Sequence, residues 1–496
     1  MEELETQFRN SCEQGYIEKV KIFLQLPSFD INCVNDNGET ALFLACFNEQ
    51  IGIVELLLAD ERVDVNRIEK SSGSTPFFAA CTVGCIEIVK LLLNDERVDI
   101  EKANNNGVTP FFAACWQQHT EVVKRMLESE RVVNVNEIEN IANNLGATPF
   151  WIACRNKQIE MIKLLLDDER IDINKATKDS KTPFYVACYY GYIEVVKLLL
   201  NDQRVDINKA NKDNETPLYT ACENGQIEIV KILLNDNRVN VNKSNKDDET
   251  PFFETCREVG EGEGERSEIV KLLLSDERVD VNLRNRDGKT PFHIACEFFD
   301  PKIMELLLND QRIDVNLVTK DGETAFHLAC NDYRNNLVQR LLSDGRIDIN
   351  QGNNKGQTPF YAICARQDED DFELLELLLN DKRVDINKPD NNGATPLWIA
   401  SDSGHIEVVE YLLASGREIN FNAKDKKGRT ALDITRMPDK EIWPKDFFPE
   451  IVEKLFQERI MVCSEITKLL IDPYKTRVRL RKQFGFAGKK ILKNLF

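Results

Sequence analysis

The sequence is poor in the residues and motifs that enzymes use for chemistry. It has only four histidines among 496 residues, and none stands in an HExxH pattern. It also lacks the GxxxxGK(S/T) loop that holds nucleotide phosphates and the elbow that presents a catalytic serine. GFAGKK, near the end of the chain, has too few residues between its glycines for a phosphate loop. These absences argue against an enzyme, and we expect no cofactor and no metal.

Long apolar runs are missing as well. The apolar runs, such as LLL, are short and stay far below the roughly 18 residues that cross a membrane. The N-terminal MEELETQFRN has neither the basic start nor the apolar stretch of a secretory signal. The net charge of −20 disfavours binding to a phosphate backbone over most of the surface. We expect a soluble monomer of the cytoplasm, with the nucleus as the alternative location.

What the sequence does contain is a repeat. The stretch TPFYVAC at 182–188 returns as TPFFAAC, TPFWIAC, TPLYTAC and TPFHIAC. Its threonine occurs thirteen times, and seven of the twelve gaps are 34 residues long. A period of this length indicates a stacked array rather than separate globular domains. The threonines are Thr6, Thr40, Thr75, Thr109, Thr148, Thr182, Thr216, Thr250, Thr290, Thr324, Thr358, Thr395 and Thr430.

Each repeat has the same internal order, and one of them serves as an example. KDNET is a polar turn, Thr216 suits a helix N-cap, and Pro217 suits the first helical position. LYTACENG predicts a short helix that ends at Gly225, and IEIVKILLNDN predicts a second helix. RVNVNKSNKD alternates, which predicts an extended arm that carries Val239 and Val241 outward. Helices this short persist only by packing on neighbouring repeats.

These units resemble the ankyrin repeat, whose signature includes TPLHxA. TPFHIA at 290–295, TPLWIA at 395–400 and GHIEVV at 404–409 carry the resemblance. It covers residues 1–436 and implies an all-α solenoid of about thirteen stacked helix-turn-helix repeats with extended arm tips. Two departures are systematic: the arm is longer, as in NDQRVDIN, and another aromatic residue usually replaces the family's histidine. Such long arms look most like expanded ankyrin families of unicellular eukaryotes.

The resemblance and the composition together divide the chain into four parts. We expect an N-terminal capping repeat at 1–39, the array at 40–436, a proline-broken connector with capping helices at 437–472, and a basic tail at 473–496. Both terminal repeats carry polar residues at usually apolar positions, which predicts polar outer faces. These residues are Arg9, Asn10, Ser11, Asp433 and Arg436.

Eleven of the fourteen cysteines stand six residues after the repeat threonine. Neighbouring helices lie ~8–10 Å apart, whereas a disulfide needs Cα atoms within about 7 Å, and four ligands on one zinc need a still closer approach. A free cysteine behaves as a small buried hydrophobe, so we interpret this ladder as packing in a reducing compartment, with a redox role as the alternative. Its members are Cys12, Cys46, Cys81, Cys115, Cys154, Cys188, Cys222, Cys256, Cys296, Cys330 and Cys364.

A ring follows three residues after the threonine in eleven successive repeats. It could form a stripe that faces a ligand, or it could stack one repeat on the next. We favour stacking, because the resemblance implies that the ankyrin histidine at this place joins neighbouring repeats. The rings are Phe43, Phe78, Phe112, Trp151, Tyr185, Tyr219, Phe253, His293, His327, Tyr361 and Trp398.

The residues just after each cysteine are the candidates for partner binding. The resemblance implies binding at the arm tips and at the exposed end of the first helix. These positions vary from repeat to repeat, and exposed aromatic residues are enriched at interface hot spots. The candidates are Phe47, Trp116, Arg155, Tyr189, Tyr190, Phe298, Phe299, Tyr333 and Arg366.

Three insertions interrupt the period, within residues 131–147, 259–266 and 366–372. The second contains GEGEGE, which follows no predicted strand and whose acidic side chains would repel a pyrophosphate, so it predicts a solvated loop. If the protein were an enzyme after all, these insertions would have to build its pocket.

The last 24 residues carry a charge of +8 with no acidic residue. Three interpretations stay open: a mobile or self-docked tail, a segment that binds anionic membrane or nucleic acid, and a motif for a protein partner. The basic residues are Lys475, Arg477, Arg479, Arg481, Lys482, Lys489, Lys490 and Lys493.

The predicted function is non-catalytic protein–protein interaction. We expect a scaffold or adaptor that binds partner proteins along the concave face of the array. The alternative is an anchor whose basic tail engages anionic membrane or nucleic acid while the array holds cargo. The chain could engage a membrane or nucleic acid only through this tail.

Overall fold

The computed structural model describes residues 2–129, 131, 133–137, 145–257, 265–332, 334–366 and 372–435, together with the single positions 466 and 468. Within these ranges the secondary structure is helical, and there is no β-strand. The chain divides into two compact units: the first unit, residues 1–246, and the second unit, residues 247–496.

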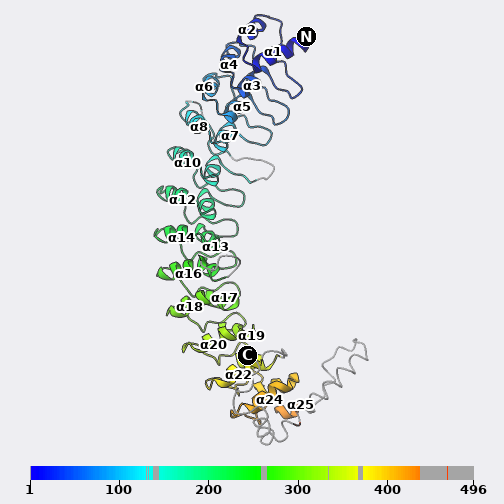
Figure 1. Ribbon diagram of the computed structural model, residues 1–496, viewed down its shortest axis with the longest axis vertical. Coiled ribbons are helices and arrows are strands. Elements are labelled where there is room, and N and C mark those ends of the chain that lie inside the picture. The colour runs from blue at the N-terminus through cyan, green and yellow to red at the C-terminus, as the bar shows by residue number, and fades with distance from the viewer. Residues whose placement is uncertain are drawn as a thin grey trace, which may run out of the picture. The chain divides into compact units, whose positions relative to one another are not determined.

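The first unit consists of helix pairs joined by arms. Figure 1 shows the odd-numbered helices in one column and the even-numbered helices in another, with the arms projecting on the side of the odd-numbered column. The helices are α1 (Glu2–Glu13), α2 (Ile17–Leu24), α3 (Ala41–Phe47), α4 (Ile51–Leu58), α5 (Pro76–Val83), α6 (Ile86–Asn94), α7 (Pro110–Trp116), α8 (Thr120–Leu127), α9 (Pro149–Arg155), α10 (Ile159–Leu166), α11 (Pro183–Tyr189), α12 (Ile193–Leu200), α13 (Pro217–Glu223) and α14 (Ile227–Leu234).

The second unit repeats this arrangement. Its helices are α15 (Pro251–Thr255), α16 (Glu265–Ser275), α17 (Pro291–Phe298), α18 (Pro301–Asn309), α19 (Ala325–Asn331), α20 (Asn335–Leu342), α21 (Pro359–Cys364), α22 (Phe372–Asn380), α23 (Pro396–Ser403), α24 (Ile406–Ala414) and α25 (Ala431–Thr435). The expectation of an all-α solenoid of stacked helix pairs is therefore confirmed.

The repeat threonine starts the first helix of each pair. Thr182 has an extended backbone, and its hydroxyl accepts a hydrogen bond from the Tyr185 amide at 3.0 Å, while Pro183 occupies the first helical position. This N-cap recurs from Thr40 to Thr395, as the sequence predicts. Thr6 is different, because α1 begins at Glu2 and the Thr6 hydroxyl donates to the Glu2 carbonyl inside the helix.

The core consists of aliphatic and aromatic side chains between neighbouring pairs. In the first unit α7 packs on α9 and α9 on α11, and in the second unit α17 packs on α19 and α19 on α21. A phenylalanine two residues after the threonine is fully buried in repeats of both units, for example Phe184 and Phe292. Burial of one such side chain stabilises the fold by roughly 1.5–3 kcal/mol, so each repeat depends on its neighbours.

The arms differ from the prediction. They form turns rather than extended strands, and Val239 and Val241 are buried instead of pointing outward. The reason is that two apolar side chains gain more from contact with the helix pairs than from exposure to water.

The N-terminal repeat also differs from the prediction. Arg9 and Ser11 are buried, where the Arg9 guanidinium donates to the Thr6 hydroxyl at 3.2 Å and the Ser11 hydroxyl to the Gln7 carbonyl at 2.7 Å. The polar outer face expected here is therefore wrong for Arg9 and Ser11, whereas Asn10 is exposed as expected, and the apolar Leu4 and Ile22 are exposed as well.

At the other end, Asp433 accepts hydrogen bonds from the Thr430 amide and hydroxyl and thereby caps α25. Arg436 and nearly all of the connector, as well as the basic tail at 473–496, lie outside the described residues. Within the connector region, Ile466 is buried and Lys468 is exposed. The boundaries proposed for these parts therefore stay predictions.

Candidate functional site

The cysteine ladder is part of the packing. All thirteen described cysteines are free and buried, and Cys463 lies outside the described residues. Burial raises the pKa of the Cys188 and Cys330 thiols well above the ordinary value, which keeps them protonated and poorly nucleophilic. The interpretation of the ladder as buried packing is confirmed.

The ring ladder joins consecutive repeats. Trp151 donates from its indole nitrogen to the Lys181 carbonyl at 3.1 Å, and the Tyr361 hydroxyl donates to Asp390 of the next repeat at 3.4 Å. His293 and His327 place their Nε2 atoms at 3.3 and 3.1 Å from the Glu323 and Gln357 carbonyls. These bonds span about one repeat, so the rings stack the array and do not face a ligand.

The arms contain a second ladder, which the sequence analysis missed. Arg204 pairs with Asp202 at 2.6 Å and donates to the Leu166 carbonyl, at the end of the second helix one repeat earlier, at 2.7 Å. Asn174 reaches forward, donating to the Arg204 carbonyl at 2.7 Å and accepting from the Asp206 amide at 2.8 Å. Equivalent bonds recur in both units, for example from Arg312 to the Leu274 carbonyl at 2.6 Å. The recurring RVDIN was visible in the sequence, but its partners are backbone atoms, which carry no side-chain signal.

Four predicted binding residues come together in the first unit. Trp116 ends α7, Arg155 ends α9, and Tyr189 ends α11 with Tyr190 at its C-cap. Because these three helices pack in succession, the four side chains follow one another along what we call the helix-end row. All four are exposed, with Trp116 at 41% and Tyr190 at 42%.

Phe47 is exposed too, but it lies two first helices before Trp116, at the end of α3, where its ring stacks on Phe43 at 6.3 Å between centroids. It therefore extends the pattern without contacting the helix-end row.

Two of the candidates in the second unit, Phe299 and Arg366, are partly buried or hydrogen-bonded within the array. Phe298 is exposed, whereas Phe299 is half-buried and takes a left-handed backbone with φ 51°, at the place where Gly191 stands in another repeat. Arg366 donates to the Asn331 carbonyl at 3.2 Å, one repeat earlier. Tyr333 lies outside the described residues.

Two cations of the second unit, Arg257 and Lys289, are paired with carboxylates. Arg257 lies 2.7 Å from Glu249 and 3.3 Å from Glu254, and Lys289 lies 2.7 Å from Glu297. The surroundings of Arg257 thus differ from those of Arg155, for which no ion pair is found among the described residues, although the helices that carry them are alike.

The comparison with known families agrees with this architecture. A family model described as ankyrin repeats in three copies matches overlapping stretches of most of the chain. They are residues 8–103, 62–138, 97–179, 134–211, 171–247, 259–353, 292–370 and 332–425. The chain belongs to the ankyrin-repeat family. Ankyrin repeats are generally modules for protein–protein interaction, and proteins built from them are typically non-enzymatic scaffolds. No curated protein matches the chain.

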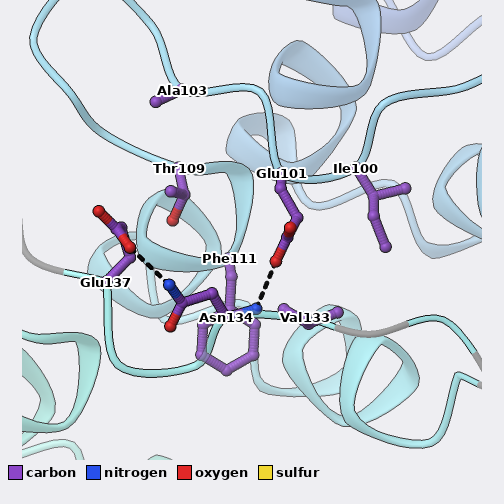
Figure 2. A pocket seen from close by; sticks show the side chains of 8 residues that line it. All are labelled: Ile100, Glu101, Ala103, Thr109, Phe111, Val133, Asn134 and Glu137. Carbon is purple, nitrogen blue, oxygen red and sulfur yellow. Dashed lines mark hydrogen bonds between the residues drawn. The ribbon is translucent and has the colours of Figure 1, made fainter.

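One cavity of about 230 Å³ opens in the ankyrin array beside the first insertion. Two hydrogen bonds join its polar residues: the Glu101 carboxylate accepts from the backbone amide of Asn134 at 2.6 Å, and the Asn134 side chain donates to Glu137 at 2.5 Å (Figure 2). Glu101 stands where other ankyrin arms have the asparagine of the arm ladder. The described residues that line this cavity include no histidine, cysteine or lysine. Its lining is Ile100, Glu101, Ala103, Thr109, Phe111, Val133, Asn134 and Glu137.

The histidines have structural partners in the ankyrin scaffold. His119 and His405 place Nε2 at 2.9 and 3.2 Å from the Thr82 and Ala365 carbonyls, each at the end of a preceding first helix. Among the described residues, no three metal-ligating side chains gather in one place. Most of the second and third insertions, 258–264 and 367–371, lies outside the described residues.

Within the described part of the ankyrin chain, no helix is long and apolar enough to span a bilayer. The basic tail, from Lys475 to Lys493, lies outside that part.

Proposed function

We propose that this protein is a non-catalytic scaffold or adaptor that binds partner proteins along the concave face of its ankyrin array, with the helix-end row of the first unit as the contact. The observation that carries the proposal is the exposure of Trp116, Arg155, Tyr189 and Tyr190 on consecutive helix ends. We further propose a monomer in the cytoplasm or nucleus, where buried free cysteines are compatible with a reducing environment.

These helix ends are suited to be a contact surface because they present exposed rings on a rigid scaffold. The helices beneath are held by N-caps, buried phenylalanines and inter-repeat bonds, so the exposed rings are presented by a preformed scaffold. Binding to such a surface loses little conformational entropy. Trp and Tyr combine large contact area with few rotatable bonds, which is why they dominate interface hot spots.

The test is affinity capture from native lysate with the full chain, followed by identification of the bound proteins. The variant Trp116→Ala/Tyr189→Ala/Tyr190→Ala is expected to lose at least about tenfold of a defined protein partner, because hot-spot residues carry most of the binding energy. A matched control is Ile22→Ala/Leu26→Ala/Ile68→Ala, which removes three similarly exposed apolar side chains of the first unit away from the row. Equal loss in both variants, or in neither, would contradict the proposal.

A second candidate function follows from the segregation of charge. The final 24 residues carry +8 in a chain of net charge −20, so the tail could anchor the protein to anionic membrane or nucleic acid. Neutralising Arg477, Arg479, Arg481 and Lys482, or truncating after residue 472, should abolish cellular localisation under this alternative. Capture that survives the truncation and fails with the row variant favours the scaffold.

A further inference from the structure

The helix-end row continues into a connected set of aromatic and cationic side chains. The Lys181 ammonium lies 5.6 Å from the Tyr189 ring centroid, the Tyr189 and Tyr190 rings are 5.0 Å apart, and the Tyr190 and Tyr192 rings are 5.5 Å apart. The Lys157 ammonium closes the series at 6.0 Å from the Tyr192 ring. Together with Arg155, these residues form what we call the aromatic–cation surface: Arg155, Lys157, Lys181, Tyr189, Tyr190 and Tyr192.

Its three cations are not neutralised within the described structure. Arg155, Lys157 and Lys181 form no ion pair with any described carboxylate; their close contacts are with aromatic rings. The nearby carboxylates Glu160 and Asp179 pair with other lysines, at 2.8 and 2.9 Å.

In two repeats of the second unit, the cations at the equivalent positions are paired with carboxylates. Arg257 occupies the position of Arg155 in its own repeat, and its partners Glu249 and Glu254 correspond to Ala147 and Ile152 in the repeat of Arg155. Lys289 corresponds to Lys181, and its partner Glu297 corresponds to Tyr189. The scaffold therefore tolerates a carboxylate at each place, and the repeats that carry Arg155 and Lys181 have an apolar or aromatic residue there instead.

Tyr192 departs from the scaffold in a second way. At this place four other repeats have a side chain that contacts the carbonyl at the end of the preceding first helix. Gln158 contacts the Trp116 carbonyl at 3.5 Å, and Arg334 contacts the Glu297 carbonyl at 2.5 Å. Tyr192 instead stacks on Tyr190 beneath Lys157. Within the described structure Tyr192 therefore makes no such bond to the preceding repeat. Its ring extends the aromatic cluster of Tyr189 and Tyr190 instead.

We infer that the aromatic–cation surface recognises an acidic, extended segment of a partner protein. Carboxylates of the segment pair with Arg155, Lys157 and Lys181, and its apolar side chains lie on Trp116 and the tyrosines. Charge-assisted bonds to carboxylates are roughly twice as strong as neutral ones, and cations held against rings are already oriented. The inference rests on the proposed function and adds the chemistry of the partner to it.

Charge decides between a protein segment and a nucleic acid. Binding to a nucleic-acid backbone typically needs several phosphate contacts on a basic face. Here three cations stand in a chain of net charge −20, which would repel a long polyanion beyond the contact. A short acidic segment interleaved with apolar residues fits the alternation of cations and rings.

The test is selection of peptides from a random library on the immobilised full chain, in parallel with two charge-reversed variants. The first variant is Arg155→Glu/Lys157→Glu/Lys181→Glu. Glutamate already occupies the three corresponding places in other repeats, at Glu297, Glu49 and Glu215, and Glu49 has φ 58° where Lys157 has φ 56°. The control variant, Lys90→Glu/Lys124→Glu/Lys197→Glu, makes the same charge change at exposed lysines of α6, α8 and α12. Circular dichroism checks that both variants fold.

The inference predicts that the wild type and the control select peptides rich in Asp and Glu. The first variant should bind those peptides at least about tenfold more weakly in fluorescence anisotropy, with a steep loss of wild-type affinity at high salt.

Three results would overturn the inference. If the selected peptides need Trp116, Tyr189 and Tyr190 but are not acidic, the proposed function stands and its acidic specificity is wrong. If a single-stranded oligonucleotide displaces the peptides and binds through the same three cations, the surface takes phosphate rather than a protein segment. If neither the ring variant nor the charge variant alters peptide binding, the helix-end row is not the contact and the proposed function fails as well.

Discussion

Arg155 in the first unit and Arg257 in the second unit stand seven residues after their repeat threonines, yet among the described residues only Arg257 is paired with carboxylates. Both guanidinium groups lie over a ring, Arg155 over Trp151 and Arg257 over Phe253, but only Arg257 is also held by carboxylates, those of Glu249 and Glu254. The helices beneath both arginines start with the same threonine cap and bury the same phenylalanine. The two repeats thus share their scaffold residues. They differ at the positions of Ala147 and Ile152, where the second repeat has Glu249 and Glu254, and this difference decides whether the arginine is paired with a carboxylate.

The largest effect should come from breaking what the two units share. Phe184→Ala in the first unit and Phe292→Ala in the second should each destabilise its unit by about 3–5 kcal/mol, because both side chains are fully buried. Urea unfolding followed by circular dichroism measures the loss, and Phe298→Ala, at an exposed position, serves as the control. A large loss in one unit only would show that the two units do not share a scaffold.

The second-largest effect should be a pH dependence of stability that is present in the second unit and weak in the first. Burial lowers the pKa of His293 to about 4 and lowers that of His327, whereas phenylalanine, tyrosine or tryptophan, which do not titrate in this range, occupies this place in the other repeats from Thr40 to Thr395. In neutral His293, Nδ1 accepts from the Thr290 amide at 3.1 Å, a bond that protonation of this nitrogen removes. Since the folded pKa lies below the unfolded value, the contribution of neutral His293 is fully present above about pH 6.5 and is lost as pH falls toward 4.

This linkage amounts to about 2 kcal/mol at pH 5 for His293. Hydrogen exchange corrected for intrinsic rates should therefore show faster opening of residues 290–330 at pH 5 than at pH 7, with little change at 182–222. His293→Tyr, which copies Tyr185 and Tyr361, should reduce the difference. An equal response of both regions would contradict the assignment.

A smaller and equal effect is expected in the arms. Arg204→Ala and Arg312→Ala each remove an ion pair and a bond to a leucine carbonyl one repeat earlier. Because both side chains are more than a third exposed, we expect a loss of about 1 kcal/mol in each unit. Thermal melting measures it, and Arg→Lys variants should recover little, since lysine lacks the planar fork.

The smallest change in stability should follow when the residues at one pair of equivalent surface positions, Glu297 and Tyr189, are exchanged between the units. Glu297→Tyr frees Lys289, and Tyr189→Glu neutralises Lys181, so each copies the arrangement of the other unit. Both should shift stability by less than about 1 kcal/mol, as is usual for exposed pairs. In anisotropy with an acidic peptide, Tyr189→Glu should weaken binding while Glu297→Tyr leaves it intact; matching behaviour would remove the distinction between the units.

Much of the fold could be predicted because the decisive signals are local. The threonine cap, the proline after it and the cysteine six residues on lie within one short helix, and their spacing indicates where that helix starts. The arms were predicted less well. Alternating valines resemble a strand, but here the bonds of the arm run to backbone carbonyls about one repeat away.

The candidate site could be predicted in position but not in chemistry. Counting from the threonine indicated that Trp116, Arg155 and Tyr189 would stand at helix ends, and they do. Counting along one repeat could not show that Arg155 lacks the carboxylates that surround Arg257. That difference becomes visible only when residues 147 and 152 are aligned with residues 249 and 254, because an ion pair depends on both of its members.

The cysteine ladder provides the protein with its own reporters of motion. Most repeats of the array bury one thiol between the helices, where a water-borne alkylating reagent reaches it only when the neighbouring layers part. The rate at which each thiol is modified therefore measures how often its own repeat opens. A single alkylation time course, resolved by peptide mass, would give the rate of local opening of each repeat along the chain without any introduced label.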